Sequence, residues 1–188
     1  ATGIYNPAWE VSKGSQTIEN LSNLKIAIEN LEEIGYNKKD NEGYFLNSSG
    51  KPLSVSLLVN KENAFRLGAA NLISKQLAAV GIKVNVKATD YNTYMQLLSS
   101  GSFDMYIAET NITYNMDVSE LLTPSGRLAY GIPKATDENA TSSALSNVIG
   151  SFYSGTGNIP DIAVTAISEM PIAPVCYRTG VLFTGDKI

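Results

Sequence analysis

The feature that most constrains this chain is a stretch between residues 53 and 108 in which strand and helix patterns alternate with almost no linker. Leu53 to Val59 alternates as a strand does, whereas Asn63 to Val80 repeats its apolar residues at helical spacing. Gly81 then suits a helix C-terminus, and Ile82 to Ala88 alternates as a second strand. A helical crossover between two strands predicts that they lie parallel in one sheet.

A second helix and a third strand continue this pattern. Asp90 is a good N-cap for a helix that carries Tyr91 and Tyr94, because its carboxylate can accept the free amide hydrogens of the first turn. Gly101 ends this helix, and apolar residues from Phe103 to Ile107 mark a third strand. The sequence therefore predicts an α/β fold with a β-α-β-α-β core.

The flanking regions predict further helices, a short hairpin and extended runs. Helices are expected over residues 17–34, 139–152 and 162–169. Tyr44 to Leu46 and Lys51 to Leu53 are expected to form a hairpin around a polar turn. Residues 171–177 and 181–184 are expected to be extended. A chain of 188 residues suits one well-packed domain, so residues 1–188 are predicted to form a single α/β lobe.

Composition excludes several classes of function. The formal net charge is −4 and the basic residues are scattered, whereas nucleic-acid binding requires a concentrated basic face. The chain has no histidine, which removes Ser-His-Asp and Cys-His catalytic arrangements and the two-histidine zinc motif. Cys176 lies in an apolar run and is expected to be a buried structural thiol. These absences exclude most hydrolase and metalloenzyme functions, and no metal site is predicted.

The carboxyl ends of the predicted strands indicate where a ligand would bind, because open parallel sheets bind ligands just beyond those ends. One such end runs from residue 109 to residue 117, after the third strand, and it contains Thr110 and Asn111. Tyr114 and Tyr130 lie in loops, unlike the tyrosines on helix faces, and this favours contact with a ligand. These four residues are predicted to bind ligand.

Several short motifs follow one another at fixed spacing along the chain. They are Gly50-Lys51-Pro52-Leu53, Ala70-Asn71-Leu72-Ile73, Val80-Gly81-Ile82-Lys83-Val84 and Gly101-Ser102-Phe103-Asp104-Met105. Residues 4–9 and 172–180 add a flanking motif on either side. In this order the motifs resemble the peptide- and nickel-type family of extracellular solute-binding proteins, often called family 5. The resemblance spans nearly the whole chain.

The resemblance implies a type-2 periplasmic-binding-protein fold, with this chain as the C-terminal lobe of a longer, two-lobed protein. Such a protein closes two lobes over a ligand and delivers it to the permease subunits of an ABC importer in the membrane. The resemblance further implies a monomeric, extracytoplasmic protein, either periplasmic or held at the cell surface as a lipoprotein. Its expected ligand is a peptide. The resemblance implies no catalysis, so we expect a protein that is not an enzyme, with no catalytic residue and no cofactor.

The same resemblance singles out Asp117 as a ligand-binding residue. Peptide-binding members of the family use an acidic residue after the third strand to pair with the α-amino group of the peptide. A D-x-S-x-L pattern of one subgroup is met here by Asp117-Val118-Ser119-Glu120-Leu121. Two alternatives stay open: another small ligand, such as a nickel complex or an oligosaccharide, and a sensory module that uses the same fold to signal to a membrane partner.

Overall fold

The computed structural model describes residues 3–6, 8–9, 24–132, 143–169 and 172–177. The chain divides into two compact units. Unit 1 combines residues 1–20 with residues 115–188, and unit 2 spans residues 21–114. The single lobe expected for residues 1–188 stays a prediction.

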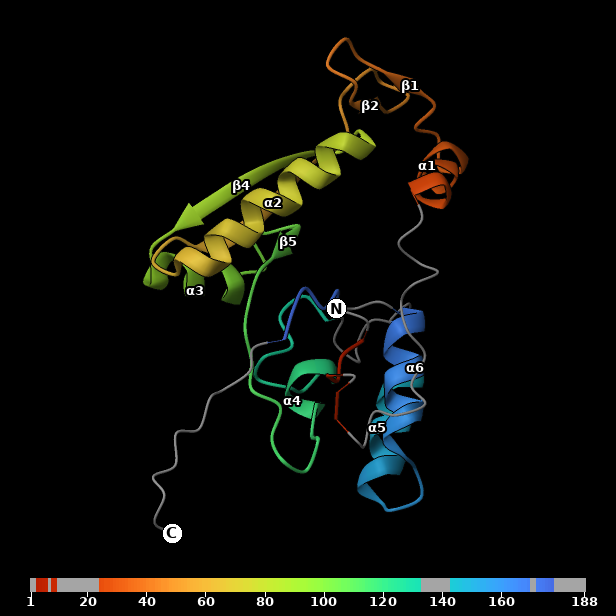
Figure 1. Cartoon of the computed structure of the whole chain (residues 1–188), viewed down its shortest axis with the longest axis vertical. Coiled ribbons are helices and arrows are strands. Elements are labelled where there is room, and N and C mark those ends of the chain that lie inside the picture. The colour runs from red at the N-terminus through yellow and green to blue at the C-terminus, as the bar shows by residue number, and fades with distance from the viewer. Residues whose placement is uncertain (1–2, 7, 10–23, 133–142, 170–171, 178–188) are drawn as a thin grey trace. The chain divides into compact units, whose positions relative to one another are not determined.

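The centre of unit 2 is a parallel three-stranded sheet (Figure 1). β3 (Ser54–Asn60) lies in the middle and pairs along its full length with β4 (Lys83–Thr89). β5 (Met105–Tyr106) pairs with the other side of β3. The predicted β-α-β-α-β core is confirmed. Because the three strands are parallel, their carboxyl ends share one edge of the sheet.

Two helices connect these strands, and both begin at the carboxyl edge. α2 (Ala64–Val80) follows Asn63, whose side chain accepts a hydrogen bond from the amide of Arg66 at 3.0 Å. α3 (Tyr91–Ser99) follows Asp90, whose carboxylate accepts one from the amide of Thr93 at 3.0 Å. The cap predicted at Asp90 is therefore confirmed.

The apolar core of unit 2 lies between α2 and one face of the sheet. Leu57 and Val59 of β3 are buried in a cluster with Ala70 of α2. Partly buried apolar residues pack against this cluster, namely Leu67, Ile73, Val84, Val86, Met105 and Ile107. Leu58 points to the opposite face, because side chains alternate along a strand, and it is also fully buried. Both faces of the central strand are thus covered.

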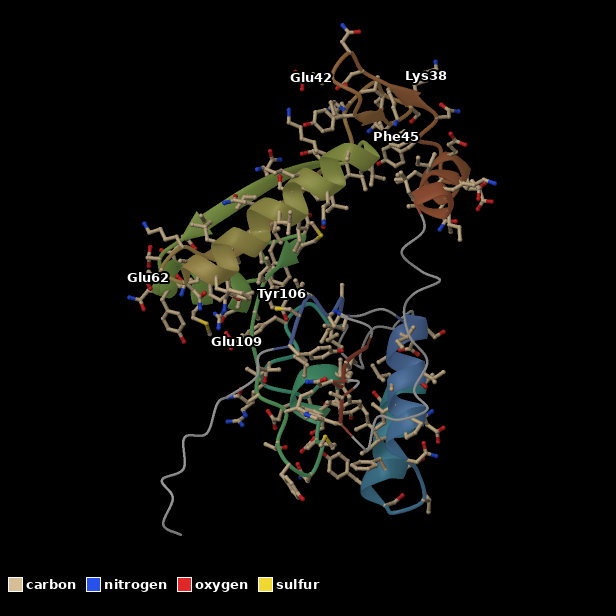
Figure 2. The ribbon with its side chains drawn as sticks, in the orientation of Figure 1. Lys38, Glu42, Phe45, Glu62, Tyr106 and Glu109 are labelled. Carbon is tan, nitrogen blue, oxygen red and sulfur yellow. The ribbon has the colours of Figure 1, made fainter. Side chains whose placement is uncertain are left out.

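The other end of unit 2 holds α1 (Leu24–Glu33), β1 (Lys38–Lys39) and β2 (Phe45–Leu46). Figure 2 labels Lys38 and Phe45 at this end, opposite the carboxyl edge of the sheet. The expected hairpin reduces to one antiparallel bridge, from Leu46 to Pro52. β2 pairs instead with β1, which the sequence does not predict because a two-residue lysine strand carries no apolar alternation.

The regular secondary structure in the described part of unit 1 is helical. It contains α4 (Ser119–Leu122), α5 (Ser143–Tyr153) and α6 (Ile159–Glu169), and α5 packs against α6 (Figure 1). Leu122, Leu145 and Ile162 are fully buried, one from each helix. None of the helices in the described ranges has the length and apolar character of a membrane-spanning helix.

The C-terminal part of the chain differs from expectation at Cys176. Residues 172–177 contain no strand, and Cys176 is exposed, so the prediction of a buried thiol is wrong. The reason is that the apolar run around it has no sheet to pack against, since Val175 is exposed as well. The expected extended run over 181–184 and parts of the expected helices, residues 17–23 and 139–142, lie outside the described residues.

Candidate ligand-binding site

The carboxyl edge of the sheet in unit 2 carries polar side chains from neighbouring strands. Asn60, the last residue of β3, is polar yet buried, and its register partner on β4 is Thr89. The Asn60 Oδ1 atom accepts a hydrogen bond from the amide of Glu62 at 3.0 Å, which fixes the turn into α2. Figure 2 shows Glu62 beside the arrowhead of β4, at this edge. The strand ends therefore stay polar where the helices begin.

An ion pair joins the first turn of α2 to the segment after β5. The Arg66 Nη2 atom lies 3.1 Å from the Glu109 Oε2 atom, and Figure 2 labels Glu109 on the chain that leaves β5. Within the part of the chain that the structure describes, Arg66 Nε and Thr89 Oγ1 are buried atoms without a hydrogen-bond partner. Buried polar atoms normally have partners. This edge therefore offers polar groups that the surrounding protein does not satisfy.

The segment after β5 carries three of the predicted ligand-binding residues, Thr110, Asn111 and Tyr114. All three belong to unit 2, lie outside helices and strands, and are exposed. The side chain of Tyr114 is fully exposed. The ion pair of Glu109 with Arg66 anchors the start of this segment to α2.

Asp117 belongs to unit 1 and lies just before α4. Its Oδ1 atom accepts a hydrogen bond from the amide of Ser119, the first residue of α4, at 2.8 Å. The hydroxyl of Tyr153, the last residue of α5, donates to Ser119 Oγ at 3.2 Å. One carboxylate and two hydroxyls thus form a polar cluster, Asp117-Ser119-Tyr153, between two helices.

This cluster keeps the Asp117 carboxyl group ionised. The nearby Tyr153 hydroxyl has the largest effect and lowers the pKa of Asp117. Partial burial acts in the opposite direction, and the hydrogen bonds from the amide and hydroxyl of Ser119 lower the pKa further. The net result is a pKa below the ordinary value, so the group is negatively charged at neutral pH. A partly exposed, oriented carboxylate of this kind suits a protonated amine.

Tyr5 supports the same turn from the N-terminal segment of unit 1. Its side chain is buried, and its hydroxyl donates to the carbonyl oxygen of Met116 at 3.0 Å. Met116 has a φ of 58°, a left-handed conformation that is unfavourable for a residue with a Cβ atom. Burial, together with the nearby Asp117 and Tyr153, raises the pKa of Tyr5, so its hydroxyl stays protonated and remains a donor.

Tyr130 is partly buried in unit 1, in the turns between α4 and α5. The structure therefore places Asp117 and Tyr130 in one unit and Thr110, Asn111 and Tyr114 in the other. Whether any of the five residues contacts a ligand stays a prediction.

A comparison with known families identifies the class of protein. The model for bacterial extracellular solute-binding proteins, family 5 Middle, matches residues 1–127, more than half of the 188 residues. The chain belongs to this family. It is a family of binding proteins. The absence of enzymatic activity stays a prediction.

A curated relative of this family 5 chain is the probable ABC transporter-binding protein of Deinococcus radiodurans. The two are 34% identical over 70 residues, which cover 37% of the chain and 12% of the relative. The chain thus spans about an eighth of the length of this relative.

Two solved structures share the fold. NikZ from Campylobacter jejuni, in complex with Ni(L-His), is 15% identical with a TM-score of 0.67, and the match covers 91% of the chain and 35% of NikZ. AppA from Bacillus subtilis, an oligopeptide-binding protein in complex with a nonapeptide, is 21% identical with a TM-score of 0.60. That match covers 79% of the chain and 30% of AppA. These likenesses confirm the predicted periplasmic-binding-protein fold.

Sequence reasoning finds Asp117 in this family 5 chain but misses the groups that hold it. Ser119 lies within the D-x-S-x-L pattern, and an aspartate can accept a hydrogen bond from the amide two residues further on, so this local contact could have been predicted. Tyr153 is 34 positions away from Ser119, and Arg66 is 43 positions away from Glu109. No local pattern relates residues so far apart, so these two contacts emerge only in the folded chain.

Proposed function

We propose that the protein is the substrate-binding component of an ABC importer and that it binds peptides between two lobes, one of which contains this chain. It acts outside the cytoplasm as a monomer and delivers its ligand to permease subunits, with no catalytic step. Membership of family 5 supports the class of protein, and AppA, which shares the fold, is in complex with a nonapeptide.

The observation that carries this proposal is the state of Asp117. The carboxylate is ionised and accepts a hydrogen bond from the amide of Ser119, yet it is only partly buried. A peptide presents a protonated α-amino group at its N-terminus, with a pKa of about 8. The two groups carry opposite charges at neutral pH, and closure of a second lobe would remove water from the pair and strengthen their attraction.

Peptide binding is tested by calorimetry on the intact protein that contains this chain, with tetra-alanine as the probe. Asp117→Ala should weaken binding by about 2 to 5 kcal/mol, because the ligand amine would be left without its charged partner in a partly desolvated site. Asp161→Ala is a matched control, since Asp161 is an exposed acidic residue in the first turn of α6 in the same unit. The control should bind tetra-alanine as the unaltered protein does.

The outcome that would remove Asp117 from the site is an unchanged affinity in Asp117→Ala. The aspartate would then serve only to cap α4. If the unaltered protein does not bind tetra-alanine at all, the peptide proposal itself is wrong.

A second candidate ligand is a small nickel complex, because NikZ, bound to Ni(L-His), matches 91% of this chain with a TM-score of 0.67. Titration of Ni(L-His) into the same protein decides between the two ligands. Binding of the complex without binding of tetra-alanine would favour the second candidate.

A further inference from the structure

The turn before α4 has a backbone conformation that is unfavourable for its sequence. Met116 has a φ of 58°, and within the residues that the structure describes it is the only residue other than glycine with a positive φ. A left-handed conformation of this kind brings the Cβ atom too close to the following carbonyl oxygen, so it persists only where the surrounding structure holds it. The next residue is Asp117. The strained position therefore lies directly beside the candidate ligand-binding carboxylate.

A buried tyrosine from the N-terminal segment of unit 1 holds this turn. The Tyr5 hydroxyl donates to the carbonyl oxygen of Met116 at 3.0 Å, across 111 positions of the chain, and Tyr5 is only 3% exposed. Hydrogen bonds within the turn are local, since the amide of Asp117 donates to Asn115 Oδ1 at 3.4 Å. The bond from Tyr5 thus ties the turn to a distant residue that is itself fixed by burial.

The carbonyl group that Tyr5 binds belongs to the peptide bond between Met116 and Asp117. A peptide bond is planar, so its carbonyl oxygen, its amide nitrogen and the Cα atom of Asp117 lie in one plane. Both polar groups of this peptide are hydrogen-bonded, the carbonyl oxygen to Tyr5 and the amide to Asn115. The Tyr5 hydroxyl therefore helps to fix the plane from which the side chain of Asp117 projects.

We propose that Tyr5 is a positioning residue for ligand recognition: through the peptide plane between Met116 and Asp117, its hydroxyl holds the backbone from which the Asp117 carboxylate reaches the amino group of a bound peptide. This inference deepens the proposed function and rests on it.

The proposal predicts a selectivity that a purely structural tyrosine would not produce. Without the hydroxyl, Met116 is free to return to a negative φ, which rotates the peptide plane and displaces Asp117. A protonated primary amine forms a charge-assisted hydrogen bond with a carboxylate, whereas an N-acetylated peptide has neither the charge nor the ammonium group. Displacement of Asp117 should therefore weaken binding of the free amine and leave binding of the acetylated peptide unaffected.

The experiment uses the intact protein that contains this chain, with tetra-alanine and N-acetyl-tetra-alanine as probes in calorimetry. Tyr5→Phe keeps the buried ring and removes only the hydroxyl. It should raise the Kd for tetra-alanine about tenfold, which corresponds to about 1.4 kcal/mol and is less than the loss in Asp117→Ala, because the carboxylate is displaced but still present. The Kd for the acetylated peptide should not change.

Tyr94 in unit 2 offers a matched control. It is also 3% exposed, and its hydroxyl also donates to a backbone carbonyl oxygen, that of Ile107, at 2.8 Å. Tyr94→Phe therefore removes the same kind of bond from an equally buried tyrosine that is not bonded to the turn before α4. It should leave the ratio of the two Kd values unchanged. A change of this ratio as large as that in Tyr5→Phe would overturn the proposal.

Glycine at position 116 separates positioning from general stabilisation. Glycine adopts a positive φ about as readily as a negative one, so the turn then depends less on the Tyr5 hydroxyl. Tyr5→Phe combined with Met116→Gly should bring the Kd for tetra-alanine back toward that of the unaltered protein. Met116→Gly alone should keep the ratio of the two Kd values. A Kd that stays tenfold raised in the double variant would contradict the positioning role.

Failure of the positioning role and failure of the proposed function give different results. If the unaltered protein prefers tetra-alanine but Tyr5→Phe changes both affinities equally or not at all, the positioning role is overturned and the proposed function stands. If the unaltered protein binds neither peptide, the proposed function is overturned, and the role of Tyr5 in recognition is overturned with it.

Discussion

The two units of this chain hold their polar groups in different ways. In unit 2 the polar residues at the sheet edge sit where strands end and helices begin, as Asn60 and Asp90 do. In unit 1, Ser119 is held by Tyr153 of α5, and the turn before it is held by Tyr5, whose partner Met116 lies 111 positions away in the chain. The first arrangement follows from local chain geometry, and the second from contacts between distant segments.

The ion pairs of the two units show a related contrast. Arg66 and Glu109 in unit 2 have side chains that are 22% and 32% exposed, whereas those of Arg127 and Glu120 in unit 1 are 86% and 49% exposed. The same type of ion pair therefore links two segments in a partly buried position in unit 2 and lies largely in solvent in unit 1. Exposure, and not the distance between the charged atoms, separates the two cases.

The largest expected effect tests whether the units are energetically separate. Leu58→Ala in unit 2 and Leu122→Ala in unit 1 each empty a fully buried position, and each should lower the free energy of unfolding by about 2 to 5 kcal/mol. Urea unfolding measures this decrease in the free energy of unfolding. Amide hydrogen exchange then shows where protection is lost, and we expect the loss within unit 2 for the first variant and within unit 1 for the second. Loss of protection in both units for either variant would support the single lobe predicted from the sequence.

A smaller effect should appear at the turn that joins α2 to β4. Gly81 has a φ of 102°, and a Cβ atom added there would lie 2.8 Å from a ring carbon of the buried Phe45. Gly81→Ala should therefore destabilise the protein by about 2 to 3 kcal/mol, through the left-handed backbone and the clash together. Gly101 has a φ of 67° with nothing near its would-be Cβ atom, so Gly101→Ala should cost about 1 kcal/mol, from the backbone alone. An equal decrease in melting temperature in the two variants would show that the Phe45 ring moves aside without cost.

The smallest effect sharpens the contrast between the ion pairs. Arg66→Met keeps the length of the side chain and removes its charge, and it should lower stability by about 1 kcal/mol because Glu109 loses a partly buried partner. Arg127→Met should leave the midpoint of urea unfolding unchanged, since its pair is largely in water. A higher salt concentration should reduce the stability loss in Arg66→Met less than any loss in Arg127→Met, because partly buried pairs are screened less. A larger loss of stability in Arg127→Met than in Arg66→Met would contradict the conclusion that the more exposed ion pair contributes less.

Sequence reasoning succeeds in the β3-α2-β4-α3-β5 part of unit 2 because these elements follow one another directly along the chain. The three strands, the helices between them, the cap at Asp90 and the helix stop at Gly81 all follow from alternation, helical spacing and single capping residues. Each of these signals lies within a few residues of the element that it predicts. The same reasoning misjudges Cys176, because whether an apolar run becomes a buried strand depends on a neighbouring sheet that the run itself does not encode.

By itself, the sequence determined the β-α-β-α-β core, its parallel sheet and the edge at which polar strand ends collect, because backbone geometry and side-chain periodicity act over short distances. Only the tertiary structure decided which groups surround the one acidic residue that the sequence singles out. The hydroxyl of Tyr153 donates to Ser119, two residues after Asp117, and the hydroxyl of Tyr5 donates to the carbonyl oxygen of Met116, which has a left-handed conformation. The physical reason is that a hydrogen bond needs its two atoms within about 3 Å, and for residues far apart along the chain only packing can bring them that close.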